Sequence, residues 1–238
     1  PEWTLIAADY SQIELRILAH LSRDANLIKA FNNDEDIHAS TASLAYNSPI
    51  SEITPEMRRV AKVLNFGVLY GLTPFGIAQQ TDLSLDQGKE FISAFFNSYP
   101  GIKDYIDQTI SFCREKGYVE SLKGRRRYLP EINSTNRIAR QAAERAAINM
   151  PIQGTAADTI KISMIKIQNH LNEMNIESKM ILQVHDELVF ESKTEDIELL
   201  NGIIIECMTT AINMDVPLKV ELKTGHNWGN MKPVMKDI

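Results

Sequence analysis

The sequence predicts an α+β fold: a small antiparallel sheet with helices on one face, interrupted by a mostly helical insertion. Strand-like segments lie near both ends of the chain, at 4–8, 177–190 and 218–223, and helical patterns fill most of the sequence between them. A sheet built from both ends of a chain encloses whatever lies between, so the helical block forms an insertion. We therefore expect a discontinuous domain (1–24 and 139–238) and an inserted helical domain (25–138).

The first elements are a strand and three helices. Residues 4–8 form a short apolar run that ends on Asp9, as a buried strand would. Ser11 then begins an amphipathic pattern that predicts a helix. Two more helices are expected at 22–32 and 36–46, the last with His38 in its first turn, before a turn at 47–51.

A longer helix is predicted from Thr54 to Gly71, where Thr54 can cap the first turn and Pro55 suits the first helical position. Along it four side chains recur at intervals of four residues: Arg58, Lys62, Phe66 and Tyr70. We call them the stripe. It spans about 18 Å, roughly the length of a nucleoside triphosphate, with a cationic end for phosphates and an aromatic end for sugar and base. A surface helix with two basic residues and two half-buried aromatics fits the same residues equally well.

The remaining elements follow from periodicity and turn residues. We expect helices at 84–99 and 101–117, and a basic hairpin or loop at 118–129 around Lys123–Arg127. A long helix runs from 134 to about 172, kinked or broken at Pro151. Residues 177–190 read as two strands joined by a tight polar turn, followed by a helix at 194–213 and a strand at 218–223.

Two carboxylates stand at strand ends of the predicted sheet, Asp9 and Asp186. Adjacent strands lie about 4.8 Å apart, so two such side chains can share a pair of divalent cations, and oxygen ligands favour Mg²⁺. Two metal ions serve in-line phosphoryl transfer. Glu187 adjoins Asp186 and can support the site. An Asp after an apolar strand is also a common turn former.

Polar residues at helical spacing form a second candidate surface, Arg145, Asn149 and Gln153. Such side chains can donate to the minor-groove edge of a duplex, although an ordinary solvated helix face shows the same spacing. The basic run at 123–127 is a candidate for phosphate contact. Among the histidines, His38 can touch phosphate and His185 can position a strand end.

Charge and composition limit the function classes. The net charge of −6 argues mildly against nucleic-acid binding, but residues 114–145 hold nine Lys/Arg against four Asp/Glu, and residues 186–238 hold five against ten. This uneven distribution is compatible with a nucleic-acid groove beside a metal site. The sequence contains no apolar run long enough for a bilayer, so no membrane partner is expected. The chain starts at Pro1 inside an apolar segment, which we interpret as a cut within a larger protein.

Four segments, in this order, resemble motifs of the family A DNA polymerases, the DNA polymerase I-like enzymes. DYSQIELR (9–16) is similar to motif A, RRVAKVLNFGVLYG (58–71) to motif B and QVHDELV (183–189) to motif C, while ERAAINMPIQGTAAD (144–158) resembles the primer–template helix. The resemblance covers essentially the whole chain. It implies a palm formed by 1–24 and 139–238 and fingers formed by 25–138, with the thumb, the preceding palm strands and any exonuclease domain absent from this chain.

The resemblance also implies a role for each candidate residue. Asp9 and Asp186 would bind two Mg²⁺ ions with help from the Tyr10 carbonyl. Arg58, Lys62 and His38 would bind the triphosphate, and Lys62 would protonate the departing pyrophosphate. Phe66 and Tyr70 would pack on the incoming sugar and the templating base position. Glu14 would be a steric gate against ribose, with Gln12 nearby. The primer–template contacts would come from Arg145, Asn149, Gln153 and His185.

These implications predict a DNA-directed DNA polymerase core that transfers a dNMP from a dNTP to a primer 3′-hydroxyl. Two alternatives remain: a nucleotide- and DNA-binding fragment without turnover, since the thumb is missing, and a single-subunit RNA polymerase, against which Glu14 argues. The expected partners are primer–template DNA, dNTP and the upstream domains of a parent protein. We expect a monomer and, by default, a bacterial cytoplasmic source, with phage and organellar sources open.

Overall fold

The computed structural model describes residues 2–234, and the chain divides into two compact units. The sheet unit comprises residues 1–17 and 155–238, and the helical unit comprises residues 18–154. The division passes through two helices, α1 (Ile13–Ser22) and α8 (Arg137–Glu173). The sequence analysis placed its domain limits at 24/25 and 138/139, so the helical unit is wider at both ends than the predicted insertion.

The sheet unit is built on one antiparallel sheet of five strands in the order β4-β5-β1-β6-β7. The strands are β1 (Trp3–Tyr10), β4 (Lys179–Val184), β5 (Glu187–Lys193), β6 (Val220–Gly225) and β7 (Lys232–Pro233). The strand nearest the N-terminus therefore pairs with strands from the C-terminal part of the chain on both sides. This confirms the small antiparallel sheet that the sequence predicted.

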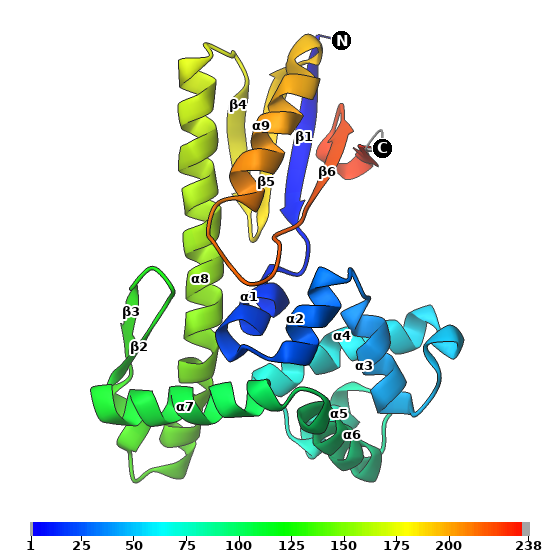
Figure 1. The fold of residues 1–238 in the computed structure, drawn as a ribbon, viewed down its shortest axis with the longest axis vertical. Coiled ribbons are helices and arrows are strands. Elements are labelled where there is room, and N and C mark those ends of the chain that lie inside the picture. Colours follow the sequence, from blue (N-terminus) through cyan, green and yellow to red (C-terminus); the bar gives the residue numbers. More distant parts are fainter. Residues whose placement is uncertain (1, 235–238) are drawn as a thin grey trace. The chain divides into compact units, whose positions relative to one another are not determined.

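Side chains of β1 alternate between the two faces of the sheet. Ile6, Ala8 and Tyr10 are buried and lie on one face. On that face the Tyr10 hydroxyl lies 2.7 Å from Ser163 Oγ of α8 and donates to the Met208 carbonyl of α9 (Ile197–Thr209) at 2.6 Å. Figure 1 shows α9 lying along β1 and β5. Helices thus cover the Tyr10 face, and Asp9 lies on the opposite one.

The first part of the helical unit is a series of capped helices. They are α2 (Ala25–Asn32), α3 (Ile37–Tyr46), α4 (Pro55–Leu69), α5 (Pro74–Gln80), α6 (Leu85–Ser98) and α7 (Pro100–Lys116). The N-caps of α2 to α6 are Asp24, Asp36, Thr54, Thr73 and Ser84, and each accepts a hydrogen bond from a backbone N–H of the first turn. These caps satisfy donors that a helix start leaves without partners, which fixes where each helix begins.

A hairpin and the first half of α8 complete the helical unit. Gly117 ends α7 with a φ of 76°, a left-handed conformation that suits glycine. The short hairpin of β2 (Tyr118–Glu120) and β3 (Arg126–Tyr128) follows, as predicted. A buried apolar cluster joins these segments to α8, with members Cys113, Val119, Leu129, Ile132, Ala143, Ala147 and Met150.

Several predicted boundaries are wrong. The first helix begins at Ile13 rather than Ser11, because Gln12 has a φ of 55° and its carbonyl accepts the first helical bond from Arg16 N. The last helix is shorter than predicted. Helix α5 and strand β7 were missed, the former although Thr73–Pro74 repeats the start signal of Thr54–Pro55.

The predicted break at Pro151 is also wrong, since α8 is one helix of 37 residues with this proline inside. Proline removes one backbone donor and disfavours the helix locally. Met150 and Ile152, its neighbours, are 7% and 0% exposed, and packing of this kind offsets the local cost. Within residues 2–234, the structure offers no helix with the length and apolar character needed to cross a membrane.

Candidate functional site

The sheet unit brings the two predicted metal-binding carboxylates close together. Asp9 is the penultimate residue of β1, and its register partner on β5 is Glu187. Asp186 lies in the two-residue turn between β4 and β5, and its carbonyl accepts a hydrogen bond from Tyr10 N at 3.3 Å. His185 precedes it with a φ of 54°, which turns the chain sharply and leaves the imidazole exposed.

A fourth carboxylate, which the sequence analysis missed, belongs to the same face of the sheet. Glu221 on β6 is the register partner of Asp9 on the other side of β1. Directly paired residues of antiparallel strands point to the same face, so Asp9, Glu187 and Glu221 share one. We call these three residues and Asp186 the acidic cluster. The alternation at 218–223 predicted a strand, but only the β1–β6 register reveals which residue lies beside Asp9.

The pKa of Asp9 is raised within the acidic cluster. Burial raises the pKa of Asp9 to about 6, and the negative charges of Asp186, Glu187 and Glu221 add to this rise, while Lys223 opposes it. A divalent cation would relieve such a concentration of negative charge, and carboxylate oxygens are the donors that Mg²⁺ prefers. The donor chemistry therefore fits a magnesium site. Residues 2–234 do not, however, contain a group of three or more His, Cys, Asp or Glu arranged to hold a metal ion by itself.

One member of the cluster is fixed by an aromatic side chain that the sequence analysis did not select. The Trp228 indole Nε1 donates a hydrogen bond to Glu187 Oε1 at 2.7 Å. This bond occupies one carboxylate oxygen and orients the other. It favours a supporting role for Glu187 over that of a principal ligand.

The residues after β1 lie in the turn that leads into α1. The Tyr10 side chain is 2% exposed and bonded within the core, so only its main-chain carbonyl can serve the site. Gln12 and Glu14 are half-buried, in the turn and in the first turn of α1. Ser11 N donates to the Lys219 carbonyl at 2.9 Å, which ties this turn to the chain just before β6.

The helical unit contains the stripe, which lies on α4 as predicted. Arg58 and Lys62 are exposed, and Phe66 and Tyr70 are half-buried. The two rings stack with centroids 6.5 Å apart and planes inclined by 30°. Tyr70 is the C-cap residue of the helix. The helix thus presents two cationic side chains followed by an aromatic pair.

The two cations of the stripe differ in their partners. Arg58 Nε donates to Asp36 Oδ2 at 2.6 Å, whereas Lys62 forms no ion pair with any residue in the described part of the chain. Partial burial acts to raise the pKa of Asp36, but hydrogen bonds from Arg58 and from the start of α3 outweigh it and lower that pKa. Of these two cations, Lys62 is therefore the more available to an anionic ligand.

His38 is buried beside these cations rather than exposed. It is 3% exposed, and its Nδ1 lies 2.9 Å from Asn65 Nδ2. The pKa of His38 is lowered to about 4, mainly by burial and also by Arg58 and Lys62, while Asp36 acts to raise it. The imidazole is thus neutral at pH 7 and acts as a hydrogen-bonding group rather than a third cation.

The predicted duplex-contacting residues lie on α8 within the helical unit. Arg145 and Gln153 are exposed and Asn149 is half-buried. Asn149 Oδ1 is buried and has no hydrogen-bond partner among the described residues. Gly71, at the end of the stripe, approaches Arg145 so closely that a Cβ there would lie 3.3 Å from Arg145 Cγ. The end of the stripe and the α8 residues are therefore neighbours.

The basic hairpin is partly neutralised by its own residues. Arg126 Nε pairs with Glu120 Oε2 at 3.1 Å, and its guanidinium lies 4.4 Å from the centroid of the Tyr118 ring. Tyr128 stands 67% exposed beside Tyr118, with ring centroids 5.5 Å apart. The hairpin thus presents both basic and aromatic groups to solvent.

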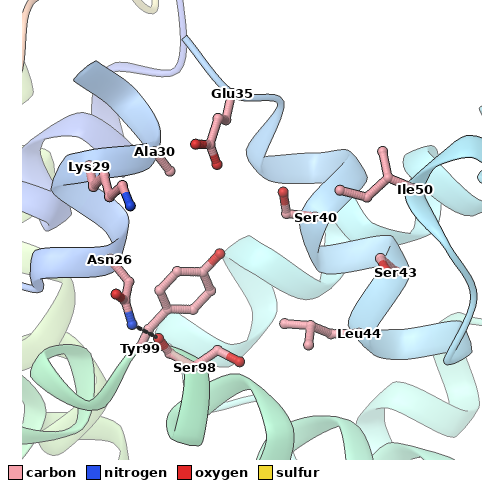
Figure 2. A pocket seen from close by; sticks show the side chains of 10 residues that line it. All are labelled: Asn26, Lys29, Ala30, Glu35, Ser40, Ser43, Leu44, Ile50, Ser98 and Tyr99. Carbon is pink, nitrogen blue, oxygen red and sulfur yellow. Dashed lines mark hydrogen bonds between the residues drawn. The ribbon is translucent and has the colours of Figure 1, made fainter. Parts of the chain in front are cut away.

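A separate cavity of about 390 Å³ lies in the helical unit, between α2, α3 and the α6–α7 corner (Figure 2). Lys29, Glu35 and Tyr99 contribute polar groups to its walls, and Asn26 Nδ2 donates to the Ser98 carbonyl at 2.8 Å. None of the site residues predicted from sequence lines it. We assign it no part in the chemistry above.

The chain is similar to known proteins over most of its length. The model of DNA polymerase family A matches residues 1–230. DNA polymerase I of Caldicellulosiruptor bescii is 49% identical over 228 residues, which cover 96% of this chain and 27% of that protein. DNA polymerase I of Bacillus subtilis is 46% identical over 231 residues, covering 97% of this chain and 26% of that protein.

A solved structure is similar over most of the chain. It is described as the POL domain of Pol1 from M. smegmatis in complex with DNA primer-template and dNTP, and it matches with a TM-score of 0.91 and 47% identity. The match covers 94% of this chain and 40% of that one. The chain spans about a quarter of the length of the two curated relatives named above.

Proposed function

This chain belongs to DNA polymerase family A, and on that premise we propose that it provides the catalytic core of a DNA-directed DNA polymerase. The reaction is attack of a primer 3′-hydroxyl on the α-phosphorus of a dNTP. The 3′-hydroxyl loses its proton to solvent as its oxygen forms a bond to the α-phosphorus, the bond between the α-phosphorus and the bridging oxygen breaks, and pyrophosphate leaves. The primer–template DNA and dNTP present in the M. smegmatis complex support the choice of substrates. The sheet unit lies within the proposed palm (1–24 and 139–238), and the proposed fingers (25–138) lie within the helical unit.

The observation on which this proposal mainly rests is the acidic cluster. Asp9 and Asp186 come from segments about 180 residues apart in sequence, and the sheet brings them to one end of β1. Asp9 has a raised pKa because it is partly buried beside other carboxylates. Two Mg²⁺ ions, held by Asp9, Asp186 and the Tyr10 carbonyl, would supply Lewis acidity toward the phosphate oxygens. Glu187, fixed by Trp228, supports these ligands.

The stripe serves the nucleotide in this proposal. Lys62 has no ion pair to a described residue that must break before it binds a phosphate, and it donates the proton that the leaving pyrophosphate needs. Arg58 adds a second charge at the expense of its pair with Asp36, and His38 contributes a neutral donor. Phe66 and Tyr70 supply an apolar surface for sugar and base.

Selection of substrate rests on three groups of side chains. Glu14, with Gln12 near it, fills the space that a ribose 2′-hydroxyl needs, which favours deoxynucleotides over ribonucleotides. Arg145, Asn149, Gln153 and His185 contact the minor groove of the primer–template. Acceptors there are nearly the same for all base pairs, so such contacts test the shape of a pair without reading its sequence. The buried Asn149 Oδ1 without a partner is consistent with an acceptor kept for a ligand.

The closest competing function is nucleotide and DNA binding without turnover, because the relatives are about four times longer than this chain. Single-nucleotide primer extension with Mg²⁺ and each dNTP, beside the Asp186→Ala variant, separates the two. Template-matched extension that Asp186→Ala abolishes supports the polymerase. Template-dependent dNTP binding without extension supports the binding fragment. The absence of both would contradict the proposed function.

A further inference from the structure

A chain of three buried polar side chains connects α3 and α4 inside the helical unit. Thr41 Oγ1 donates to Asn65 Oδ1 at 2.8 Å, and Asn65 Nδ2 lies 2.9 Å from His38 Nδ1. The three residues are 0%, 1% and 3% exposed. His38 and Thr41 are one turn apart on α3, and Asn65 faces both of them from α4, between Lys62 and Phe66 of the stripe. The sequence analysis selected His38 but neither of its two partners.

The direction of these hydrogen bonds determines where the imidazole proton lies. Asn65 accepts from Thr41 through its carbonyl oxygen, so its amide NH₂ group faces His38. An NH₂ group can only donate, and His38 Nδ1 must therefore accept. A neutral imidazole has one proton, which then resides on Nε2. The reversed amide would place the proton on Nδ1 instead and make Nε2 an acceptor.

We propose that Thr41 and Asn65 are positioning residues that keep His38 in the neutral form with its proton on Nε2, so that the ring donates one hydrogen bond to a phosphate group. The assignment to phosphate rests on the proposed function; the assignment of the proton does not. A donor of this kind adds directionality next to Arg58 and Lys62 without a third positive charge. An Nδ1-protonated ring would present a lone pair to the phosphate oxygens and repel them.

The surroundings of His38 agree with a neutral ring. Burial lowers its pKa to about 4, Arg58 and Lys62 act in the same direction, and Asp36 opposes them. An amide NH₂ group against Nδ1 also disfavours the imidazolium, which needs an acceptor at each nitrogen. The hydrogen bond from Asn65 and the lowered pKa therefore both indicate a neutral His38 ring.

The test is nuclear magnetic resonance of the 238-residue chain with ¹⁵N-labelled imidazole rings at pH 7. A His38→Gln variant identifies the His38 signals among those of the five histidines. Two-bond ¹H–¹⁵N correlations distinguish the two neutral tautomers from each other and from the imidazolium. We expect the Nε2-protonated tautomer. An Nδ1-protonated ring or an imidazolium in the unaltered chain would overturn the proposal.

Two variants test the roles of the partners. Asn65→Asp keeps an acceptor for Thr41 but replaces the NH₂ group with an oxygen, so His38 Nδ1 should become protonated. Thr41→Val removes the hydroxyl at nearly constant shape and should allow a mixture of tautomers, whereas Thr41→Ser keeps the hydroxyl and should preserve the original pattern. Unchanged His38 signals in both Asn65→Asp and Thr41→Val would contradict the positioning role.

Nucleotide affinity provides the functional readout. We expect Thr41→Val to weaken dNTP binding several-fold, since part of the population loses the Nε2–H donor without any change in charge, and Thr41→Ser to retain the affinity of the unaltered chain. Inorganic tripolyphosphate should show the same order of affinities, because the effect concerns phosphate. Equal affinities in all variants would refute the phosphate role. If the unaltered chain binds no dNTP, the proposed function fails, and the tautomer is still decided by the spectrum.

Discussion

The acidic cluster of the sheet unit is negatively charged, and the stripe of the helical unit carries two positive charges. In each region, burial and neighbouring charged groups shift the pKa of one side chain. In the cluster, burial of Asp9, together with the carboxylates around it, raises its pKa to about 6. On the stripe, two cations lie near His38 and, with burial, lower its pKa to about 4. Structural ion pairs place opposite charges together, as in Arg114 with Glu144 at 2.6 Å. In the acidic cluster four carboxylates face one opposing cation, Lys223, and on the stripe Lys62 forms no ion pair with any residue from 2 to 234, which suggests that ligands supply part of the counter-charge.

Removal of a carboxylate from the acidic cluster should have the largest effect. Asp186→Asn should lower the rate of nucleotide incorporation by on the order of 10³-fold or more, since it removes charge that would hold Mg²⁺ at the reacting phosphate. Single-turnover primer extension measures this. Glu191→Gln is the matched control, because Glu191 lies on the same face of the sheet as Glu187 but farther along β5, away from Asp9. A loss shared by both variants would show that general charge, rather than the cluster, matters.

Removal of Lys62, which forms no ion pair with a described residue, should have the next largest effect. We expect Lys62→Ala to reduce kcat/KM for dNTP by about 100-fold, through weaker phosphate binding and loss of the proton donor. Arg59→Ala, an exposed cation on the same helix outside the stripe, should stay within about twofold of the unaltered chain. Steady-state kinetics at constant ionic strength would make the comparison. Equal losses would argue for a diffuse electrostatic effect.

Glu14 tests whether the turn after β1 selects the sugar. Glu14→Ala should raise incorporation of ribonucleotides relative to deoxynucleotides by about tenfold or more, because space for a 2′-hydroxyl opens. The ratio of incorporation efficiencies for one rNTP and its dNTP is the measurement. A ratio unchanged from that of the unaltered chain would remove Glu14 from the gate.

Phe66 tests the aromatic end of the stripe. We expect Phe66→Tyr to increase use of dideoxynucleotides relative to dNTP several-fold, since a hydroxyl on the ring can replace an interaction of the missing 3′-hydroxyl. Competition between a ddNTP and its dNTP on one template gives the ratio. Tyr70→Phe provides a change of the same size on the neighbouring ring. If both variants keep the original ratio, Phe66 does not lie against the sugar.

The smallest expected effect concerns stability and its dependence on pH. Asp9 has a higher pKa folded than unfolded, about 6 against 3.8, so the folded chain binds the extra proton and stability falls as pH rises between these values. Asp9→Asn removes this loss and should stabilise the chain at pH 7 by on the order of 1 kcal/mol, after allowance for solvent exposure. His38, with Arg58, Lys62 and Asp36 facing it, acts oppositely: its contribution is lost as pH falls from 6.5 toward 4.

Urea unfolding from pH 4 to pH 8 would check these signs. The difference between Asp9→Asn and the unaltered chain should grow from pH 4 to pH 7. Mg²⁺ at millimolar concentration should stabilise the unaltered chain and leave Asp9→Asn nearly unaffected. Destabilisation by Asp9→Asn at pH 7 would contradict the view that the cluster contains uncompensated charge.

The sequence predicted well those features that depend on local patterns. Three features could be predicted from short segments of sequence. They are the apolar run before Asp9, the polar turn at His185–Asp186, and the N-cap and four-residue periodicity of α4. Helix α5 had a readable signal in Thr73–Pro74, but seven residues are too few for a clear helical period. The break predicted at Pro151 is wrong because packing along α8 outweighs the local preference of proline.

Features that depend on register or rotamer could not be predicted. Glu221 joins Asp9 only through pairing of strands more than 200 residues apart in sequence. The bonds from Trp228 to Glu187 and from Thr41 to Asn65 depend on tertiary packing that no spacing rule describes. His38 was chosen as a phosphate contact, yet its burial and neutrality follow from neighbours on α3 and α4. Sequence patterns thus selected most of the candidate site residues, and the structure added the neighbours that contact or lie beside them.

If the acidic cluster and the stripe both bind the nucleotide, as we propose, Mg²⁺ should strengthen dNTP binding through the cluster, and the affinity should also depend on Lys62 of the stripe. Affinity would be measured by calorimetry on the chain with primer–template DNA, with and without Mg²⁺, in the unaltered form and in Asp186→Asn, Lys62→Ala and Glu191→Gln. We expect Mg²⁺ to strengthen binding in the unaltered chain and in Glu191→Gln. In Asp186→Asn most of that gain should vanish, and in Lys62→Ala affinity should be weaker under both conditions. An equal gain from Mg²⁺ in all four proteins would show that the acidic cluster takes no part in binding the nucleotide.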